Sequence, residues 1–467
     1  MNPFKKLLSQ TAIYGLSSVI GRLLNYLLVP LYTRVFIPEE YGVMTEMYAY
    51  LAFFLVLLTY GMETTFFRFS NKHENKNVYS TALISVLSTA LLFLVFINLK
   101  TETIANSIGY VGSEKLIVWL SFIIFLDVVS AIPFARLRNQ NKAVRFSIIK
   151  LINIFVNIAL NIYFVIIMQY GFEYVFIANL ISSTITLFLL APELIYINWV
   201  FDLFLYRKMI KYSLPLLFVG LAGMINEAID RILLKFYISD TNVVMSELGI
   251  YGAFYKLSII MTLFIQTFRY AAEPFFFAQS KSENNVKIYA QVLNYFVITT
   301  ATIFLFVIIF YDVVINFIGE DFHDERGFLV VSILLLANMF LGIYYNLSIW
   351  YKLIDKTYFG AILSIFGAVI TLGLNIYLIP KISFVGSAWA TLICYFLMVL
   401  ASLFLSKKQF PIPYNIKRIT FYILSMLTIY FIVLITDFHM FVDTIWIALF
   451  LLIAFIIEKP KKIINFE

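Results

Sequence analysis

The 467-residue sequence is poor in charged residues and in cysteine, and each shortage excludes a class of protein. Charged residues make up 13% of the chain, whereas a water-soluble domain needs about 25% to cover its surface. The single cysteine, Cys394, excludes an internal disulfide framework. The three histidines are isolated and no Cys/His cluster has the spacing of metal ligands, so we expect no metal site and no cofactor.

Common catalytic motifs are also missing. The chain contains no GxxxxGK[ST] run, so it has no P-loop for ATP hydrolysis, and nothing resembles the GxSxG turn of serine hydrolases. The stretches between the apolar runs are short and offer little platform for a catalytic site. We therefore predict that the protein is not an enzyme.

The sequence is instead rich in long hydrophobic segments. Hydrophobic residues make up 62% of the chain and the mean hydropathy is +0.91. Apolar runs recur from end to end, and about fourteen of them have the roughly 20 residues that cross a bilayer. The sequence thus predicts an all-α integral membrane protein of about fourteen transmembrane helices. The expected spans are residues 12–35, 44–67, 78–98, 115–135, 146–168, 173–196, 213–236, 248–268, 288–311, 328–350, 358–379, 383–405, 418–436 and 441–457.

Basic residues alternate between the two sides of the expected membrane. With the N-terminus in the cytoplasm, most Lys and Arg residues fall in cytoplasmic connections, whereas the outer loop from Asp312 to Arg326 is acidic. This positive-inside pattern predicts a bacterial inner-membrane protein with both termini in the cytoplasm. The net charge of +7 therefore indicates topology and not nucleic-acid binding. The N-terminal segment lacks a cleavage site, so we expect it to remain as the first helix.

Short internal matches indicate a duplication. LNIY occurs at 160–163 and 374–377, Arg22-Leu-Leu is similar to Arg231-Ile-Leu, and Tyr41-Gly42 recurs at 251–252. The separations are all about 210 residues, as expected of a repeated unit. We expect two pseudo-symmetric six-helix lobes in the same orientation, followed by two extra helices. The expected parts are a first lobe over 1–197, an amphipathic cytoplasmic linker over 198–212, a second lobe over 213–406, and two helices with a cytoplasmic tail over 407–467.

Charged and amide side chains inside the expected spans are the candidate binding residues, because a charge at mid-bilayer costs about 2.5–3.5 kcal/mol. Arg22 and Asn25 continue a polar stripe formed by Thr11, Gly15 and Ser18 at helical spacing. One interpretation is a hydrated cavity in which the cations face an anionic ligand. The candidate cavity residues are Arg22, Asn25, Asn157, Glu227, Asp230, Arg231 and Lys256.

The alternative interpretation of the same residues is structural. Arg231 lies four residues after Glu227 and could pair with it on one helix face. Lys150, Asn153, Asn157 and Asn161 form a stripe, as do Ser364, Gly367, Thr371 and Asn375, and such stripes also bond neighbouring helices. We favour the structural reading for the Asn stripe and the functional reading for Arg22, which has no acidic residue within a turn.

Several stretches resemble the polysaccharide-transport branch of the multidrug/oligosaccharidyl-lipid/polysaccharide exporter superfamily, the Wzx-type flippases. They are PLYTRVF at 30–36, PEEYG at 38–42, Asp230-Arg231 with LGIYGAFYKL at 248–257, and LNIYLIPK with VGSAWATL between 374 and 392. The resemblance implies a MATE-like pair of six-helix bundles that opens alternately to each side. It implies an undecaprenyl-diphosphate-linked oligosaccharide as substrate, flipped for O-antigen, capsule or exopolysaccharide assembly, with Arg22, Arg231 and Lys256 as cavity cations.

The resemblance also implies coupling to H+, Na+ or the membrane potential, and polysaccharide-assembly membrane proteins as partners. Three other functions stay open. A lipid II flippase has the same architecture but a denser set of cavity arginines, and a multidrug exporter has an acidic residue in the first helix, where this chain has Arg22. A membrane glycan polymerase would be an enzyme with large outer loops. A purely structural scaffold fits poorly with buried unpaired charges.

Overall fold

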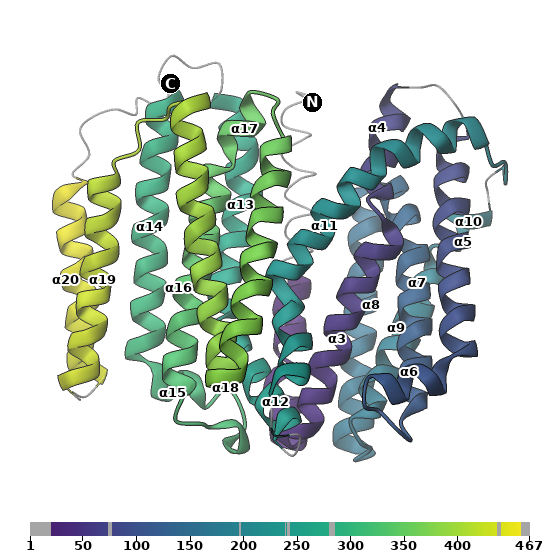
Figure 1. Cartoon of the computed structure of the whole chain (residues 1–467), viewed down its shortest axis with the longest axis horizontal. Helices are drawn as coiled ribbons and strands as arrows, with labels where there is room; N and C mark the ends of the chain where they lie inside the picture. The colour runs from purple at the N-terminus through teal and green to yellow at the C-terminus, as the bar shows by residue number, and fades with distance from the viewer. Residues whose placement is uncertain are drawn as a thin grey trace. The chain divides into compact units, whose positions relative to one another are not determined.

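The structure is a computed structural model that describes residues 20–72, 77–195, 198–238, 240, 243–279, 285–436 and 440–458. Over these ranges every regular element is a helix (Figure 1). In chain order they are α2 (Val29–Val35), α3 (Pro38–Thr59), α4 (Met62–Lys72), α5 (Val78–Leu99), α6 (Thr101–Ser107), α7 (Glu114–Asn139), α8 (Ala143–Asn161), the π-helix η1 (Ile162–Ile167), α9 (Glu173–Leu189), α10 (Ala191–Ile195), α11 (Leu203–Tyr237), α12 (Val244–Leu257), α13 (Ile259–Gln279), α14 (Asn285–Ile309), α15 (Tyr311–Ile315), the 3-10 helix η2 (Glu320–Phe322), α16 (Gly327–Leu347), α17 (Ile349–Leu353), α18 (Tyr358–Gln409), α19 (Ile416–Thr436) and α20 (Met440–Ile457).

The all-helical, multi-span membrane architecture expected from the sequence is confirmed. Among the described residues, 8 helices are long and apolar enough to cross a membrane, or up to 9 if the bent pair α12 and α13 forms one span. The helices over 173–189 and 443–457 are apolar but shorter. The count of about fourteen spans stays a prediction.

Two long helices differ from the expected boundaries. α11 runs for 35 residues with Pro215 inside it, and it begins at Leu203 because Asp202 caps its start by accepting a hydrogen bond of 2.9 Å from the Leu205 N–H. The expected span 213–236 is thus the second half of a longer helix. The spans expected at 358–379 and 383–405 follow each other directly in α18, with non-helical backbone only at Ile382 and Ser383. Ser383 has a φ of 50° and its hydroxyl donates to the Glu247 carboxylate, which holds this turn.

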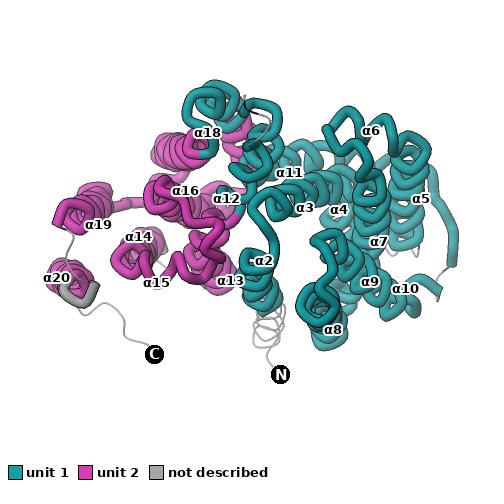
Figure 2. The backbone as a smooth tube through the Cα atoms, turned by 90° about the horizontal axis from the view of Figure 1, so that it is seen from below, with its two compact units in different colours: residues 1–252, 371–384 teal, residues 253–370, 385–467 magenta. Residues whose placement is uncertain are grey.

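The chain divides into two compact units, whose boundaries fall within α12 and α18 (Figure 2). Unit 1 comprises residues 1–252 and 371–384, and unit 2 comprises residues 253–370 and 385–467. In unit 1, α7 packs against α5 and α9, α8 packs against α9, and α11 runs beside α3. In unit 2, α14 packs against α16, α19 and α20. The lobe boundaries expected near 197 and 213 stay a prediction.

Glycines set the crossing of α3 and α12 within unit 1. A Cβ atom on Gly42 would lie 2.1 Å from the carbonyl oxygen of Met245, and one on Gly249 would lie 1.9 Å from that of Pro38. Only glycine permits two backbones to approach so closely. These residues belong to the PEEYG and LGIYG stretches, so a physical reason for both motifs is the helix crossing.

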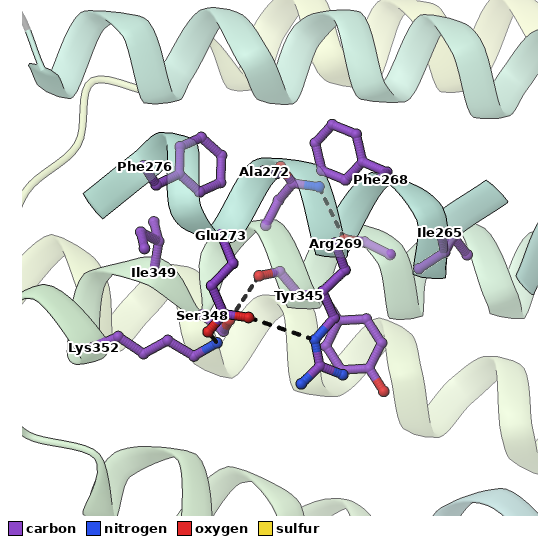
Figure 3. Close-up of a pocket in the computed structure, with 12 residues that line it drawn as sticks. Ile265, Phe268, Arg269, Ala272, Glu273, Phe276, Tyr345, Ser348, Ile349 and Lys352 are labelled. Carbon is purple, nitrogen blue, oxygen red and sulfur yellow. Dashed lines mark hydrogen bonds and ion pairs between the residues drawn. The ribbon is translucent and has the colours of Figure 1, made fainter. Parts of the chain in front are cut away.

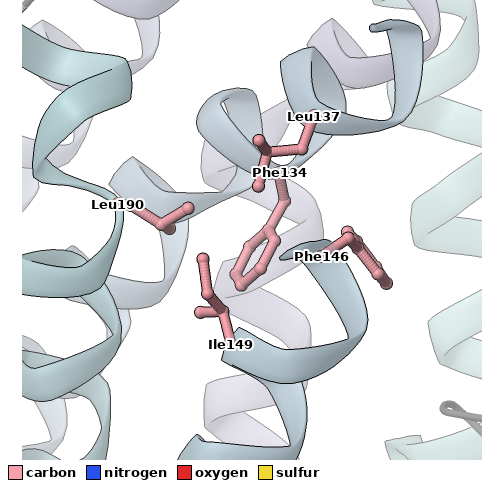
Figure 4. Close-up of a cluster of buried hydrophobic side chains, with 5 residues drawn as sticks. All are labelled: Phe134, Leu137, Phe146, Ile149 and Leu190. Atoms are coloured by element: carbon pink, nitrogen blue, oxygen red, sulfur yellow. The ribbon is translucent and has the colours of Figure 1, made fainter. Parts of the chain in front are cut away.

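One end of unit 1 is held by charged and aromatic side chains around Glu193, which is buried. Its carboxylate lies 3.0 Å from Arg145 Nη1 and 3.6 Å from Arg136 Nε, and its carbonyl accepts a hydrogen bond from the Tyr79 hydroxyl. The sequence assigns the connections that carry these residues to a single side of the membrane. Beside them lies a core cluster shown in Figure 4, made of Phe134, Leu137, Phe146, Ile149 and Leu190.

In unit 2, the two C-terminal helices are tied to the rest by Glu458. Its Oε1 accepts hydrogen bonds from Arg418 at 3.1 Å, from the Tyr422 hydroxyl at 2.9 Å and from Asn294 of α14 at 3.3 Å. The acidic loop before α16 is closed by Arg326, whose Nε and Nη2 donate to Asp324 at 2.8 and 2.7 Å. That guanidinium lowers the pKa of the Asp324 carboxyl.

Candidate functional site

Arg22 and Asn25 lie on a helical segment, residues 20–26, that stops just before α2. The break at Leu27 and Leu28 precedes Pro30, which has no N–H to continue the helix. Gly21 of this segment faces α8, since a Cβ there would lie 2.6 Å from the Ile154 side chain. The neighbouring residues Arg22 and Asn25 are exposed.

The Arg22 guanidinium makes no hydrogen bond or ion pair with any residue in the described ranges. Thr11, Gly15 and Ser18 of the same expected stripe lie outside those ranges. A guanidinium carries five N–H donors and stays charged, so it needs water or an anion when the protein supplies no acceptor. The described residues therefore supply no acceptor for the Arg22 guanidinium, and its role as a ligand-binding cation stays a prediction.

The candidates on α11 divide into exposed and buried side chains. Arg231 is half-buried, and its Nη1 donates to the main-chain carbonyl of Glu227 at 3.2 Å. The Glu227 carboxylate is exposed and forms no ion pair with Arg231 within the described part of the chain. The structural interpretation of the sequence expected an ion pair between these two side chains. In the structure Arg231 instead bonds the main-chain carbonyl of Glu227.

Asp230 is buried, with 4% of its surface exposed, and points towards α12. Its carboxylate accepts hydrogen bonds from the Tyr251 hydroxyl and from the Arg231 N–H, the latter at 2.9 Å. One turn earlier, Asn226 accepts a hydrogen bond of 3.0 Å from Thr371 of α18. These contacts lie within unit 1 and join α11 to α12 and α18, so Asp230 holds helices together in this structure.

The Asn stripe of α8 is bonded to neighbouring helices. Asn153 donates to Thr186 of α9 at 2.8 Å, and Asn157 donates to Ser182 of α9 at 3.4 Å. Asn161 donates to Asn157 Oδ1 at 2.9 Å and accepts from the Tyr32 hydroxyl of α2 at 2.9 Å. Such interhelical bonds are the structural role that the stripe's spacing also allowed.

Two charged residues near this stripe, Asp127 and Lys150, were not among the candidates. Ser183 of α9 donates a hydrogen bond of 2.8 Å to the carboxylate of Asp127 on α7. Lys150 Nζ of α8 lies 4.3 Å from the centre of the Phe134 ring. The sequence shows Asp127 and Lys150 as charges inside two expected spans. It does not show that α7 packs against α8, which brings the two helices together.

Lys256 lies in the last turn of α12, is half-buried and belongs to unit 2, whereas Arg22 and Arg231 belong to unit 1. Unit 2 also contains a small groove lined by α13, α16 and α17, with a free volume of about 20 Å³ (Figure 3). Arg269, Glu273 and Lys352 meet there. Sequence reasoning took Arg269 and Lys352 as topology signals only.

Unit 1 has a separate apolar cavity of about 140 Å³ between α3, α5, α6 and α7. Its walls expose only apolar atoms, so it offers no partner for a sugar or a phosphate. No group of three or more His, Cys, Asp or Glu side chains that could hold a metal occurs among the residues that the structure describes. His73 and His439 lie outside them.

Known proteins show which fold these helices form. A family described as "Polysaccharide biosynthesis protein" matches residues 7–279. No curated protein matches the chain. Among solved structures, the lipid II flippase MurJ in an inward closed conformation has a TM-score of 0.76 at 20% identity, covering 96% of this chain and 98% of that chain. An inward-facing MATE multidrug transporter of the MOP superfamily has a TM-score of 0.66 at 14% identity, covering 85% and 95%.

A third structure, a MOP superfamily transporter from Pyrococcus furiosus whose title reports a binding pocket of reverse polarity, has a TM-score of 0.56 at 14% identity. It covers 85% of this chain and 94% of that chain. At these identities the likeness establishes the fold and not the substrate. The fold is that of the MurJ and MATE transporters, which confirms the MATE-like architecture expected from the sequence.

Proposed function

Because the chain belongs to the polysaccharide biosynthesis protein family, we propose that it is a flippase for an undecaprenyl-diphosphate-linked oligosaccharide. It moves this repeat unit across the bacterial inner membrane by alternating access, for the assembly of O-antigen, capsule or exopolysaccharide. The family match supports the polysaccharide pathway, and the MurJ- and MATE-like fold supports transport. Neither family nor fold is that of an enzyme, and catalysis forms no part of the proposal.

The surroundings of Arg22 are the main observation that supports this proposal. Its exposed guanidinium lies in an expected membrane span and meets no acceptor in the described part of the protein. An unpaired cation at such a depth is costly unless water or an anion reaches it. A diphosphate supplies that anion, and the guanidinium fork binds phosphate oxygens through two parallel hydrogen bonds.

The remaining parts of the proposal follow from this mechanism. Arg231 and Lys256 are the other cavity cations, and Asn25 and the exposed Glu227 carboxylate bind sugar hydroxyls or the coupling cation. An H+ or Na+ gradient, or the membrane potential, drives the alternation. Both termini lie in the cytoplasm, as the positive-inside pattern predicts. Other polysaccharide-assembly membrane proteins receive the flipped unit.

The test is a flipping assay with purified protein in proteoliposomes. An undecaprenyl-diphosphate oligosaccharide that carries a fluorophore on its glycan is placed in the outer leaflet, and a membrane-impermeant quencher reports how much stays outside. We expect the protein to protect a growing fraction, and Arg22→Ala proteoliposomes to protect no more than protein-free vesicles. Equal protection by the two proteins would contradict the assignment of Arg22.

A lipid II flippase is the second candidate, because the MurJ structure aligns over 96% of this chain. Labelled lipid II and a cationic drug serve as parallel substrates in the same assay. We expect faster movement of the oligosaccharide that lacks the peptide than of lipid II, and no ion-driven export of the drug. Movement of lipid II alone would overturn the proposed substrate and favour the second candidate.

A further inference from the structure

The groove in unit 2 holds two basic side chains around one carboxylate (Figure 3). Lys352 Nζ of α17 donates to Glu273 Oε1 of α13 at 2.7 Å, and Arg269 Nε lies 4.0 Å from Glu273 Oε2. The cluster therefore carries one more positive charge than negative charge. The second contact is at the limit of an ion pair, so Arg269 is only loosely neutralised.

Arg269 is positioned by an aromatic ring instead. Its Cζ lies 4.7 Å from the centre of the Tyr345 ring of α16, which is within the range of a cation–π contact. The side chain is 51% exposed, and its terminal nitrogens donate no hydrogen bond to any residue within the described ranges. The planar fork of a guanidinium whose N–H groups have no acceptor in the described chain is suited to a carboxylate or phosphate.

A buried amide also lines the groove. Asn346 of α16 lines the groove and is 4% exposed. Its Nδ2 donates to the Gly342 carbonyl at 3.1 Å, but Oδ1 has no hydrogen-bond partner in the described part of the chain. Buried polar atoms are nearly always paired, so this acceptor requires a donor such as water or a sugar hydroxyl, which the phosphate oxygens do not supply.

We propose that this groove binds the diphosphate group of the lipid-linked substrate, an inference that rests on the proposed function. Arg269 and Lys352 bind the phosphate oxygens. When the substrate is absent, the Glu273 carboxylate occupies the position of the phosphate. The free volume of about 20 Å³ holds little more than a water molecule, so binding requires the Glu273 side chain to turn away. Glu273 is 38% exposed and has room to do so.

The predicted topology gives the groove a role. The positive-inside pattern assigns the connections that follow α13 and α17 to the cytoplasm, where a lipid-linked repeat unit is made before it is flipped. A diphosphate carries more negative charge than a carboxylate and neutralises the two cations more fully. The groove thus acts as a loading site, in which the substrate displaces an internal carboxylate before transport.

The experiment measures binding of radiolabelled undecaprenyl diphosphate to the full-length protein in phosphatidylcholine nanodiscs. We expect Arg269→Gln to weaken binding about tenfold or more, as loss of a charge-assisted phosphate contact does. Glu273→Gln should strengthen binding several-fold because the competing carboxylate is gone. Arg326→Gln is the matched control, since it removes the same charge from a loop of unit 2 and should leave binding unchanged.

The gain of affinity in Glu273→Gln is the decisive result, because misfolding cannot produce it. If both groove variants bind like the wild type, the groove is not the site, whatever the flipping assay shows. If phosphatidylglycerol competes as strongly as unlabelled undecaprenyl diphosphate, the groove is a general site for anionic lipid and the substrate assignment is wrong. If the wild type binds no undecaprenyl diphosphate at all, the proposed function itself is overturned.

Discussion

Lys235 of α11 donates a hydrogen bond of 2.9 Å to the carboxylate of Glu46 on α3. The Glu46 side chain has no exposed surface. The ammonium also lies 3.7 Å from the centre of the Tyr110 ring, whose hydroxyl donates to the same carboxylate. This pair fastens the end of α11 to the start of α3 within unit 1. Breaking a buried ion pair by removing one partner costs about 3–5 kcal/mol, because the other charge stays buried.

We therefore expect Lys235→Met to lower the thermal stability of the purified protein markedly, and the double variant with Glu46→Gln to recover much of the loss. The measurement is thermal unfolding in detergent, followed by loss of monodisperse protein. Lys115→Met is the control, since Lys115 is exposed in the first turn of α7. A double variant no more stable than Lys235→Met would show that the charge pairing is not what stabilises this contact.

The glycine crossing of α3 and α12 predicts a sharp contrast between substitutions. Gly249→Ala places a methyl group 1.9 Å from the Pro38 carbonyl oxygen, so the helices must separate and the protein should fail to accumulate. Gly223→Ala is the matched control, because a Cβ there meets nothing within 4 Å and alanine favours the helix by about 1 kcal/mol. Membrane levels of fluorescent fusions measure both. Equal levels would mean that the two helices do not cross at these residues.

Much of the fold could be predicted from local sequence, because hydropathy over about 20 residues identifies a span without its neighbours. The start of α11 and the turn at Ser383 could not, since they depend on the Asp202 cap and on a hydroxyl contact with Glu247 across 136 positions. Residues Glu46 and Lys235, 189 positions apart, likewise meet only after folding.

The candidate site shows the same limit. The helical spacing of Asn157 and Asn161 is compatible with both a structural and a functional role. Only the positions of α9 and α2, which contact these side chains, distinguish the two roles. The positive-inside pattern alone explains why Arg269 and Lys352 are basic. The sequence therefore offered no reason to expect the groove that they form with Glu273. Arg22 could be chosen as a candidate ligand-binding cation because an isolated charge within an apolar run is visible without tertiary structure, and this role stays a prediction.

The predicted topology can be tested by cysteine labelling. Cys394 is buried and its thiol donates to the Gly367 carbonyl at 3.4 Å, so we expect the hydroxyl of Cys394→Ser to keep this contact and the fold while the native thiol is removed. Single cysteines at Ser107 and Glu320 should react with an impermeant maleimide added to whole cells, and those at Lys142 and Lys408 only after lysis. All four residues are exposed, so accessibility reports the side of the membrane and not burial. Protection of Glu320 in whole cells would contradict the assigned orientation.

The last prediction concerns Arg22, whose guanidinium contacts no acceptor in the described structure. We expect Arg22→Ala to abolish delivery of the lipid-linked glycan in cells while membrane levels stay near normal, because no contact within the described fold is lost. Arg22→Lys should retain part of the activity, since the charge survives while the two-pronged phosphate geometry is lost. Surface polysaccharide, quantified against membrane protein level, is the measurement.

Arg207→Ala and Arg207→Lys are the controls for this series, because Arg207 is an exposed arginine of unit 1 outside the candidate site. Both should deliver glycan at the wild-type level, which separates loss of a ligand contact from loss of positive charge in general. An Arg22→Ala protein that transports normally would make Arg22 a packing or lipid-facing residue. An Arg22→Ala protein that fails to accumulate while Arg207→Ala accumulates would show that Arg22 supports the fold, although its guanidinium contacts no acceptor among the described residues.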